Sequence, residues 1–115
     1  MQFSRGDVVL VLFPYSNLRT AKRRPALVVQ ADRLQTGLNQ TIVAMISSNL
    51  ARAGHPSRVK VTKSSSEGQQ MGIHSDSIIM TDNLATVHES EIDRSIGHLS
   101  NLAAVAAALK ATLGL

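Results

Sequence analysis

Short apolar runs separated by polar, turn-forming segments restrict the fold of this sequence more than any other feature. Three continuous runs are rich in valine, leucine and isoleucine: DVVLVLF at 7–13, ALVVQA at 26–31 and TIVAMIS at 41–47. Runs of this length and composition are typical of buried strands. Pro25 precedes the second run, and proline, which lacks an N–H, belongs at the start or edge of a strand. We therefore predict three buried strands, the second beginning at Pro25 after an exposed loop over 15–24.

The second half of the chain predicts further strands and a single helix. Strands are expected at three more places: 57–62, where polar and apolar side chains alternate, 76–87 and 95–99. The strand over 76–87 is expected to be interrupted or bulged near Thr81 and Asp82. The polar segment 63–72 predicts a flexible turn. Residues 100–115 form the only convincing helix.

Several short strands with one terminal helix predict a mainly β fold with a C-terminal helix. Its core is a small, strongly bent antiparallel sheet or barrel, and not an alternating βαβ arrangement. With 115 residues and 43% hydrophobic content, the chain suits one domain over residues 1–115. The absence of cysteine excludes disulfides and thiolate metal sites and suits a reducing cytoplasm. No run approaches the ~18 apolar residues of a membrane span, so we expect a soluble, cytoplasmic protein.

Positive charge is concentrated in the first part of the chain. Residues 1–63 carry ten Lys and Arg against two Asp, a net charge of +8. Residues 64–115 carry two basic and six acidic residues, a net charge of −4. This asymmetry favours a polyanionic partner on one face, either a nucleic acid or an acidic protein segment. A basic protein without such a partner has the same net charge, so charge alone does not decide between them.

The sequence contains none of the common cofactor or metal motifs. Its four histidines, His55, His74, His88 and His98, lack the i, i+4 spacing of a helical zinc site. It has no glycine-rich phosphate loop and no GxSxG motif. We therefore expect no metal and no cofactor, and structural or surface roles for the histidines. His55 has the strongest claim to another role, since it lies in the basic segment RAGHPSR.

One arginine and two serines are placed to meet at the edge of the sheet. Arg24 precedes the second strand, and Ser47 and Ser48 end the third. If these strands are antiparallel neighbours, the start of one lies beside the end of the other. A guanidinium offers a planar fork of donors matched to phosphate oxygens, and a hydroxyl adds one more donor. The sequence therefore predicts a phosphate site.

A phosphate site of this kind can cleave RNA without a metal. RNA carries its own nucleophile, the 2′-hydroxyl. A protein can cleave it by aligning that oxygen with the scissile phosphate and stabilising the charge that develops. Arginine is a poor base, with a pKa above ~12, so Asp82 or a histidine is the candidate for proton transfer.

Five segments, in order and spacing, match a known family pattern. They are RGDVVLVLFP, KRRPALVVQ, IVAMISSN, DSIIMTDNLATV and IGHLS, followed by a terminal helix ending in LGL. Together they cover nearly the whole chain and resemble the MazF/PemK toxins of bacterial type II toxin–antitoxin systems. The resemblance implies a small SH3-like barrel, a homodimer, and a metal-independent, growth-inhibiting endoribonuclease. Such an enzyme cuts single-stranded mRNA at selected sequences and leaves a 2′,3′-cyclic phosphate. It is neutralised by a cognate antitoxin whose acidic C-terminal segment covers the RNA groove.

The resemblance assigns catalytic roles to three residues. The family's arginine, just before the strand-opening proline, falls on Arg24, and its threonine at the end of the following strand falls on Ser47. An aspartate that some members use for acid–base chemistry falls on Asp82. This chain departs from the family in its first loop, where NLRT (17–20) replaces a GSEQ-like stretch. It also has Met80 where some members carry a basic residue.

RNA contacts are expected from residues that flank this site. Lys22 and Arg23 supply general electrostatic attraction, Tyr15 is placed to stack on a base, and Ser48 is a rival of Ser47. The full predicted RNA-binding set is Tyr15, Arg19, Lys22, Arg23, Ser48, His55 and Arg58. Two other functions stay open: a toxin of the same fold that binds a protein target such as DNA gyrase, and an RNA-binding relative without activity.

Overall fold

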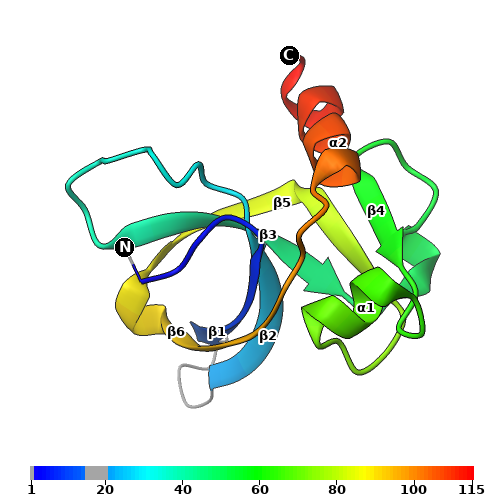
Figure 1. Ribbon diagram of the computed structural model, residues 1–115, viewed down its shortest axis with the longest axis horizontal. Coiled ribbons are helices and arrows are strands. Elements are labelled where there is room, and N and C mark those ends of the chain that lie inside the picture. The colour runs from blue at the N-terminus through cyan, green and yellow to red at the C-terminus, as the bar shows by residue number, and fades with distance from the viewer. Residues whose placement is uncertain (1, 15–20) are drawn as a thin grey trace.

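The computed structural model describes residues 2–14 and 21–115, and a strongly bent, six-stranded antiparallel sheet dominates this part of the chain (Figure 1). The strands lie in the order β4-β5-β3-β2-β1-β6. The strands are β1 (Asp7–Pro14), β2 (Ala21–Val28), β3 (Gln40–Ser47), β4 (Arg58–Val61), β5 (Ser77–His88) and β6 (Ile92–His98). The helices are α1 (Ser66–Met71) and α2 (Ala103–Leu113), with single 3₁₀ turns at η1 (Leu50–Arg52) and η2 (Glu89–Glu91). The predicted mainly β fold with a C-terminal helix is confirmed.

The bent sheet carries a hydrophobic cluster on each of its two faces. Leu27 of β2 belongs to the first cluster, together with Met71 of α1 and Val105 of α2. Its neighbour Ala26 belongs to the second cluster, with Val43 of β3. Successive side chains of a strand point to opposite faces, so burial on both faces explains why these strands are unbroken apolar runs in the sequence.

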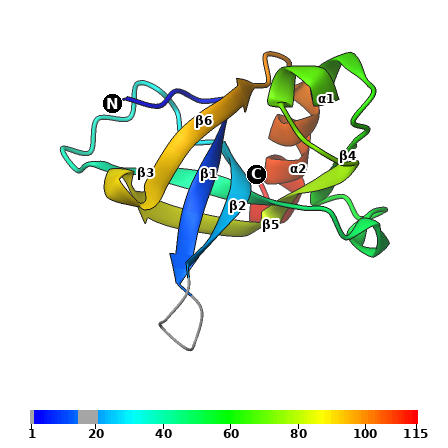
Figure 2. The ribbon, with the colours of Figure 1, turned by 90° about the horizontal axis from the view of Figure 1, so that it is seen from below.

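β2 begins earlier than the sequence predicts. The strand Ala21–Val28 includes the basic cluster KRR (22–24), which the sequence pattern places in a loop before Pro25. β2 pairs with β1 over nearly its whole length, whereas its pairing with β3 starts only at Ala26. Pro25 thus occupies a stretch where β2 has a neighbour on one side only, a position that tolerates proline. Figure 2 shows β1 and β2 extending from the sheet as a two-stranded ribbon.

The segment predicted to be a flexible turn instead contains α1. The Ser65 hydroxyl accepts a hydrogen bond from the Gly68 N–H at 3.0 Å and caps the start of the helix. Gly72 ends it in the left-handed conformation, with φ of 70°. Met71 is fully buried in the first cluster. A helix of six residues is too short to show an apolar periodicity, so its caps are its only signal in the sequence.

β5 carries the interruption that the sequence predicts near its middle. Adjacent residues of β3, Ala44 and Met45, pair with Leu84 and Met80 of β5. Residues 81–83 therefore bulge from the ladder. The bulge releases these three residues from β3, so that Thr81 hydrogen-bonds to Ser57 in the loop before β4 and Asp82 pairs with Arg58 of β4.

The sheet is open, because its edge strands β4 and β6 do not pair with each other in the described part of the chain. α1 follows β4 in the sequence and packs on β6, with Gly72 against the backbone of Ile96. Of the two predicted forms, a strongly bent sheet or a barrel, the structure has the bent sheet, and α1, which follows one edge strand in the chain, packs on the other.

Candidate functional site

Arg24 and Ser47 line the same pocket, at the end of the β2–β3 pair. The register pairs Ala26 with Met45 in antiparallel strands, and its extension by two residues places Arg24 opposite Ser47. Because side chains alternate along a strand, both lie on the face of the second cluster, whose Met45 also lines the pocket. The structure thus brings together the two residues that the sequence analysis expected to meet.

This pocket has a volume of about 300 Å³ and a cationic lining. Among the described residues it is lined by Arg24, Met45, Ile46, Ser47, Arg52, Met80, Asn83 and Ala85, a set with two arginines and no acidic residue. A larger pocket of about 360 Å³ is lined by residues of the segment before β3 and by the start of that strand, and Asp32 is the one charged side chain among its described lining residues. Of the two pockets, the first has the chemistry suited to an anion.

The Ser47 hydroxyl also organises the chain that leaves β3. Its oxygen accepts a hydrogen bond from the Asn49 N–H at 3.1 Å. Asn49 Oδ1 in turn accepts from the Ala51 N–H at 3.2 Å and caps η1. These bonds do not use the hydroxyl proton of Ser47, which is available for donation to an anion. Ser48 is exposed and absent from the described lining of the pocket, so Ser47 is the better placed of the two serines.

Asp82 is bound to Arg58. Arg58 Nη2 lies 2.8 Å from Asp82 Oδ2, and its Nε lies 3.4 Å from Oδ1. The hydrogen bond from Arg58 lowers the pKa of Asp82 below its ordinary value of 3.8, against the opposing effect of burial. A carboxylate with a lowered pKa is a weak proton acceptor at neutral pH.

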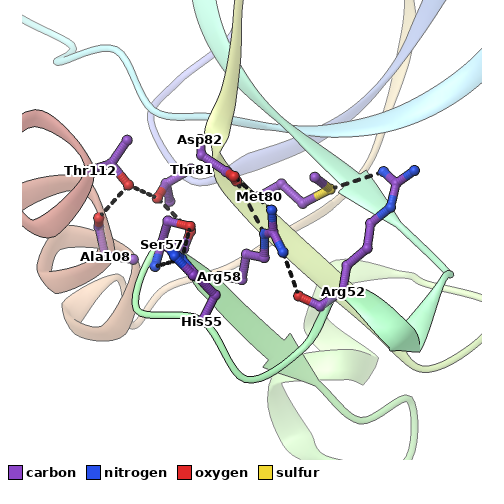
Figure 3. Close-up of polar contacts among 9 residues, drawn as sticks. All are labelled: Arg52, His55, Ser57, Arg58, Met80, Thr81, Asp82, Ala108 and Thr112. Atoms are coloured by element: carbon purple, nitrogen blue, oxygen red, sulfur yellow. Dashed lines mark hydrogen bonds and ion pairs between the residues drawn. The ribbon is translucent and has the colours of Figure 1, made fainter.

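A chain of hydrogen bonds ties the loop before β4 to β5 and α2 (Figure 3). His55 Nδ1 accepts from the Ser57 N–H at 3.2 Å and lies 2.6 Å from Ser57 Oγ. The Ser57 carbonyl accepts from the Thr81 hydroxyl at 2.6 Å. That hydroxyl lies 2.8 Å from the Thr112 hydroxyl of α2. These contacts indicate a structural role for His55, because they anchor the loop that also carries Arg52.

The other predicted RNA-binding residues do not appear in the described lining of the pocket. Lys22 is exposed on β2. Arg23 Nε forms an ion pair with Asp93 Oδ2 of β6 at 3.1 Å. Tyr15 and Arg19 lie outside the residues that the structure describes.

Sequence reasoning missed two residues of the pocket, Arg52 and Asn83. Arg52 ends η1, the turn that follows β3, and Asn83 lies in the β5 bulge. The local signal for this turn is Asn49, because asparagine is a favoured cap residue. Asn49 caps η1, the turn that brings Arg52 back toward Ser47. The sequence places the bulge correctly, but only the register shows which of its side chains reaches the pocket.

Two kinds of feature are absent from the described residues 2–14 and 21–115. No group of three or more His, Asp or Glu side chains is arranged to hold a metal ion. Neither helix in this part of the chain has the length and apolar content that crossing a bilayer requires.

A family model matches almost the whole chain. The model of the PemK-like, MazF-like toxins of type II toxin–antitoxin systems matches residues 4–113. No curated protein matches the chain in sequence.

Solved structures share the fold at low sequence identity. An endoribonuclease in complex with its cognate antitoxin, from a mycobacterial species, has a TM-score of 0.76 at 18% identity, with 98% of this chain and 96% of that chain covered. The Mycobacterium tuberculosis toxin MazF-mt6 has a TM-score of 0.73 at 22% identity, with 95% and 97% covered. A chain of a MazE–MazF structure from Deinococcus radiodurans has a TM-score of 0.74 at 19% identity, with 100% and 99% covered. These likenesses show a MazF-like fold.

Proposed function

Because this chain belongs to the PemK-like, MazF-like toxins of type II toxin–antitoxin systems, we propose that it is a metal-independent endoribonuclease toxin. Its substrate is single-stranded mRNA cut at selected sequences, and its product carries a 2′,3′-cyclic phosphate. The observation that carries this proposal is the cationic pocket shared by Arg24 and Ser47. One protein of similar fold is described as an endoribonuclease bound to its cognate antitoxin.

In the proposed reaction the RNA supplies the nucleophile and the pocket stabilises charge. The bond between the 2′-oxygen and phosphorus forms, and the bond between phosphorus and the 5′-oxygen breaks. One proton leaves the 2′-hydroxyl and one joins the 5′-oxygen. Arg24 offers paired N–H donors to the phosphoryl oxygens, and the Ser47 hydroxyl donates one more hydrogen bond. Preorganised donors of this kind lower the barrier by stabilising the charge of the transition state.

We assign Asp82 a positioning role in place of the proton transfer that its family position suggests. Its carboxylate holds Arg58, and Arg58 Nη1 donates to the Arg52 carbonyl at 3.1 Å. The hydrogen bond from Arg58 lowers the pKa of Asp82, which makes its carboxylate a weaker proton acceptor and favours the ion pair over proton transfer.

The proposal includes the partners that family membership implies. A cognate antitoxin inserts an acidic C-terminal segment over the pocket, and a second copy of the chain completes a homodimer in the cytoplasm. The net charge of +8 in residues 1–63 supports binding of both an acidic segment and RNA.

Cleavage of a long RNA of defined sequence, in excess EDTA, tests the proposed function. We expect cuts at a recurring short sequence, with a cyclic phosphate on the upstream fragment when the ends are mapped. The same sequence carrying 2′-O-methyl groups lacks the nucleophile and is expected to stay intact. If the unmodified RNA also stays intact, the ribonuclease proposal is wrong, and binding to a protein target or to RNA without cleavage becomes the better explanation.

Substitution of Ser47 with alanine is expected to slow cleavage roughly 10- to 100-fold, the value of one hydrogen bond to a charged group. Ser48→Ala is the matched control, since Ser48 is exposed beside the pocket, and a change below about threefold is expected. Ser47→Thr keeps the hydroxyl and should retain most of the rate. Single-turnover rates measure these effects, and equal losses for the two alanine variants would argue against the role of Ser47.

A further inference from the structure

Arg52 presents a second guanidinium to the pocket of Arg24 and Ser47. Its side chain lines the pocket from η1, and its Nη1 lies 3.5 Å from Met80 Sδ on β5. Figure 3 shows the side chain extending from the η1 turn to the sulfur of Met80. β3 lies between β5 and β2 in the sheet. Arg52, through its contact with Met80, therefore lines the β5 side of the pocket, and Arg24 lines its β2 side.

Backbone contacts fix Arg52 relative to Ser47. The Arg52 N–H donates to the Asn49 carbonyl at 3.2 Å, and the Asn49 N–H donates to Ser47 Oγ at 3.1 Å. From the other side, Arg58 Nη1 donates to the Arg52 carbonyl at 3.1 Å, while Asp82 holds Arg58. Hydrogen bonds to both its N–H and its carbonyl therefore fix the backbone of Arg52 relative to the Ser47 hydroxyl.

The charge of Arg52 is not neutralised within the described residues. No carboxylate in this part of the chain forms an ion pair with it, whereas Arg23 is paired with Asp93 and Arg58 with Asp82. Its side-chain hydrogen bond goes to a thioether, which is a weak acceptor. A guanidinium has five N–H donors in a fork that matches phosphate oxygens. The guanidinium of Arg52 therefore has the charge and the N–H donors to bind an anion in the pocket.

We propose that Arg52 is a second phosphate-contacting residue of the RNA site. Arg52 binds an oxygen of the RNA backbone on the β5 side of Ser47, and Arg24 binds on the β2 side. The two contacts fix the path of the RNA strand across the hydroxyl of Ser47. The identity of the ligand as RNA rests on the proposed function, but the phosphate contact is measurable without cleavage.

The salt dependence of RNA binding tests this contact. Each phosphate contact to a single strand contributes about 0.7 to the slope of log K against log salt. The probe is a 2′-O-methyl oligoribonucleotide of mixed sequence, which the protein cannot cut. Arg52→Gln is expected to make the slope shallower by about 0.7. The matched control is Arg33→Gln, which removes the same charge from an exposed residue before β3, at the end of that strand remote from Ser47; its slope should equal that of the parent.

Equal slopes for all three proteins, or an equal loss in both variants, would overturn the Arg52 contact. Thermal unfolding should show that both variants keep the parent melting temperature, since both side chains are exposed. Cleavage of unmodified RNA by the parent is measured in parallel. If the parent cuts no RNA, the proposed ribonuclease function fails, and the slope comparison still decides whether Arg52 binds phosphate.

Discussion

Replacement of Arg24 with alanine is expected to lower the rate of RNA cleavage about 100- to 1,000-fold, the usual effect of removing one preorganised donor to a developing oxyanion. Arg24 lines the pocket opposite Ser47, where its guanidinium can meet the phosphoryl oxygens as their charge grows. The loss should appear in the single-turnover rate at saturating RNA, because the interaction is stronger in the transition state than in the bound substrate.

Arg23→Ala is the matched control for this prediction. Arg23 is the adjacent residue of the same strand, so its side chain points to the opposite face, where it pairs with Asp93. Both substitutions remove one exposed positive charge from β2. We expect Arg23→Ala to change this saturated rate less than about tenfold, because the general electrostatic attraction of Arg23 acts on RNA binding, which the substitution weakens most at low salt. Similar rates for the two variants would show that Arg24 acts only through the general field of the basic cluster.

The main site residues could be predicted because they follow from strand order and register. Arg24 and Ser47 stand at the start and end of two apolar runs, and antiparallel pairing of those runs is enough to bring them together. Arg52 could not be found in this way, because its position depends on the η1 turn and on Arg58. Those contacts join loop residues to a side chain on another strand, and no local pattern reports them.

In the fold as well, features with a local sequence pattern could be predicted, and features that depend on tertiary contacts could not. The buried strands were predictable from their composition, and the β5 bulge from the polar residues that interrupt it. The start of β2 could not be predicted, because the basic cluster 22–24 lies in the part of this strand that pairs with β1 alone. α1 was missed because its six residues show no apolar periodicity, and the burial of Met71 and the packing against β6 are tertiary contacts that no local pattern reports.

Packing of α1 on β6 predicts an unusually large cost for a single methyl group at Gly72. This residue has φ of +70°, a conformation that costs an L-residue about 1–2 kcal/mol. A Cβ there also overlaps the carbonyl oxygen of Ile96, a backbone atom that cannot rotate away. Relief of that overlap requires α1 and β6 to separate, and overpacking of this kind costs about 1–3 kcal/mol more. Gly72→Ala should therefore lower the free energy of unfolding by about 2–5 kcal/mol.

Gly37→Ala separates the cost of the positive φ from the cost of the steric overlap. Gly37 has a similar φ of +78°, but a Cβ there meets no atom within 4 Å. It should therefore lose only the conformational part, about 1–2 kcal/mol. Urea unfolding of both variants, with unchanged m-values, measures the difference. A larger loss at Gly72 means that contact between α1 and β6 helps to hold the two edges of the open sheet together. Equal losses would mean that α1 can move off β6 at little cost, and that the bent sheet keeps its shape without the helix.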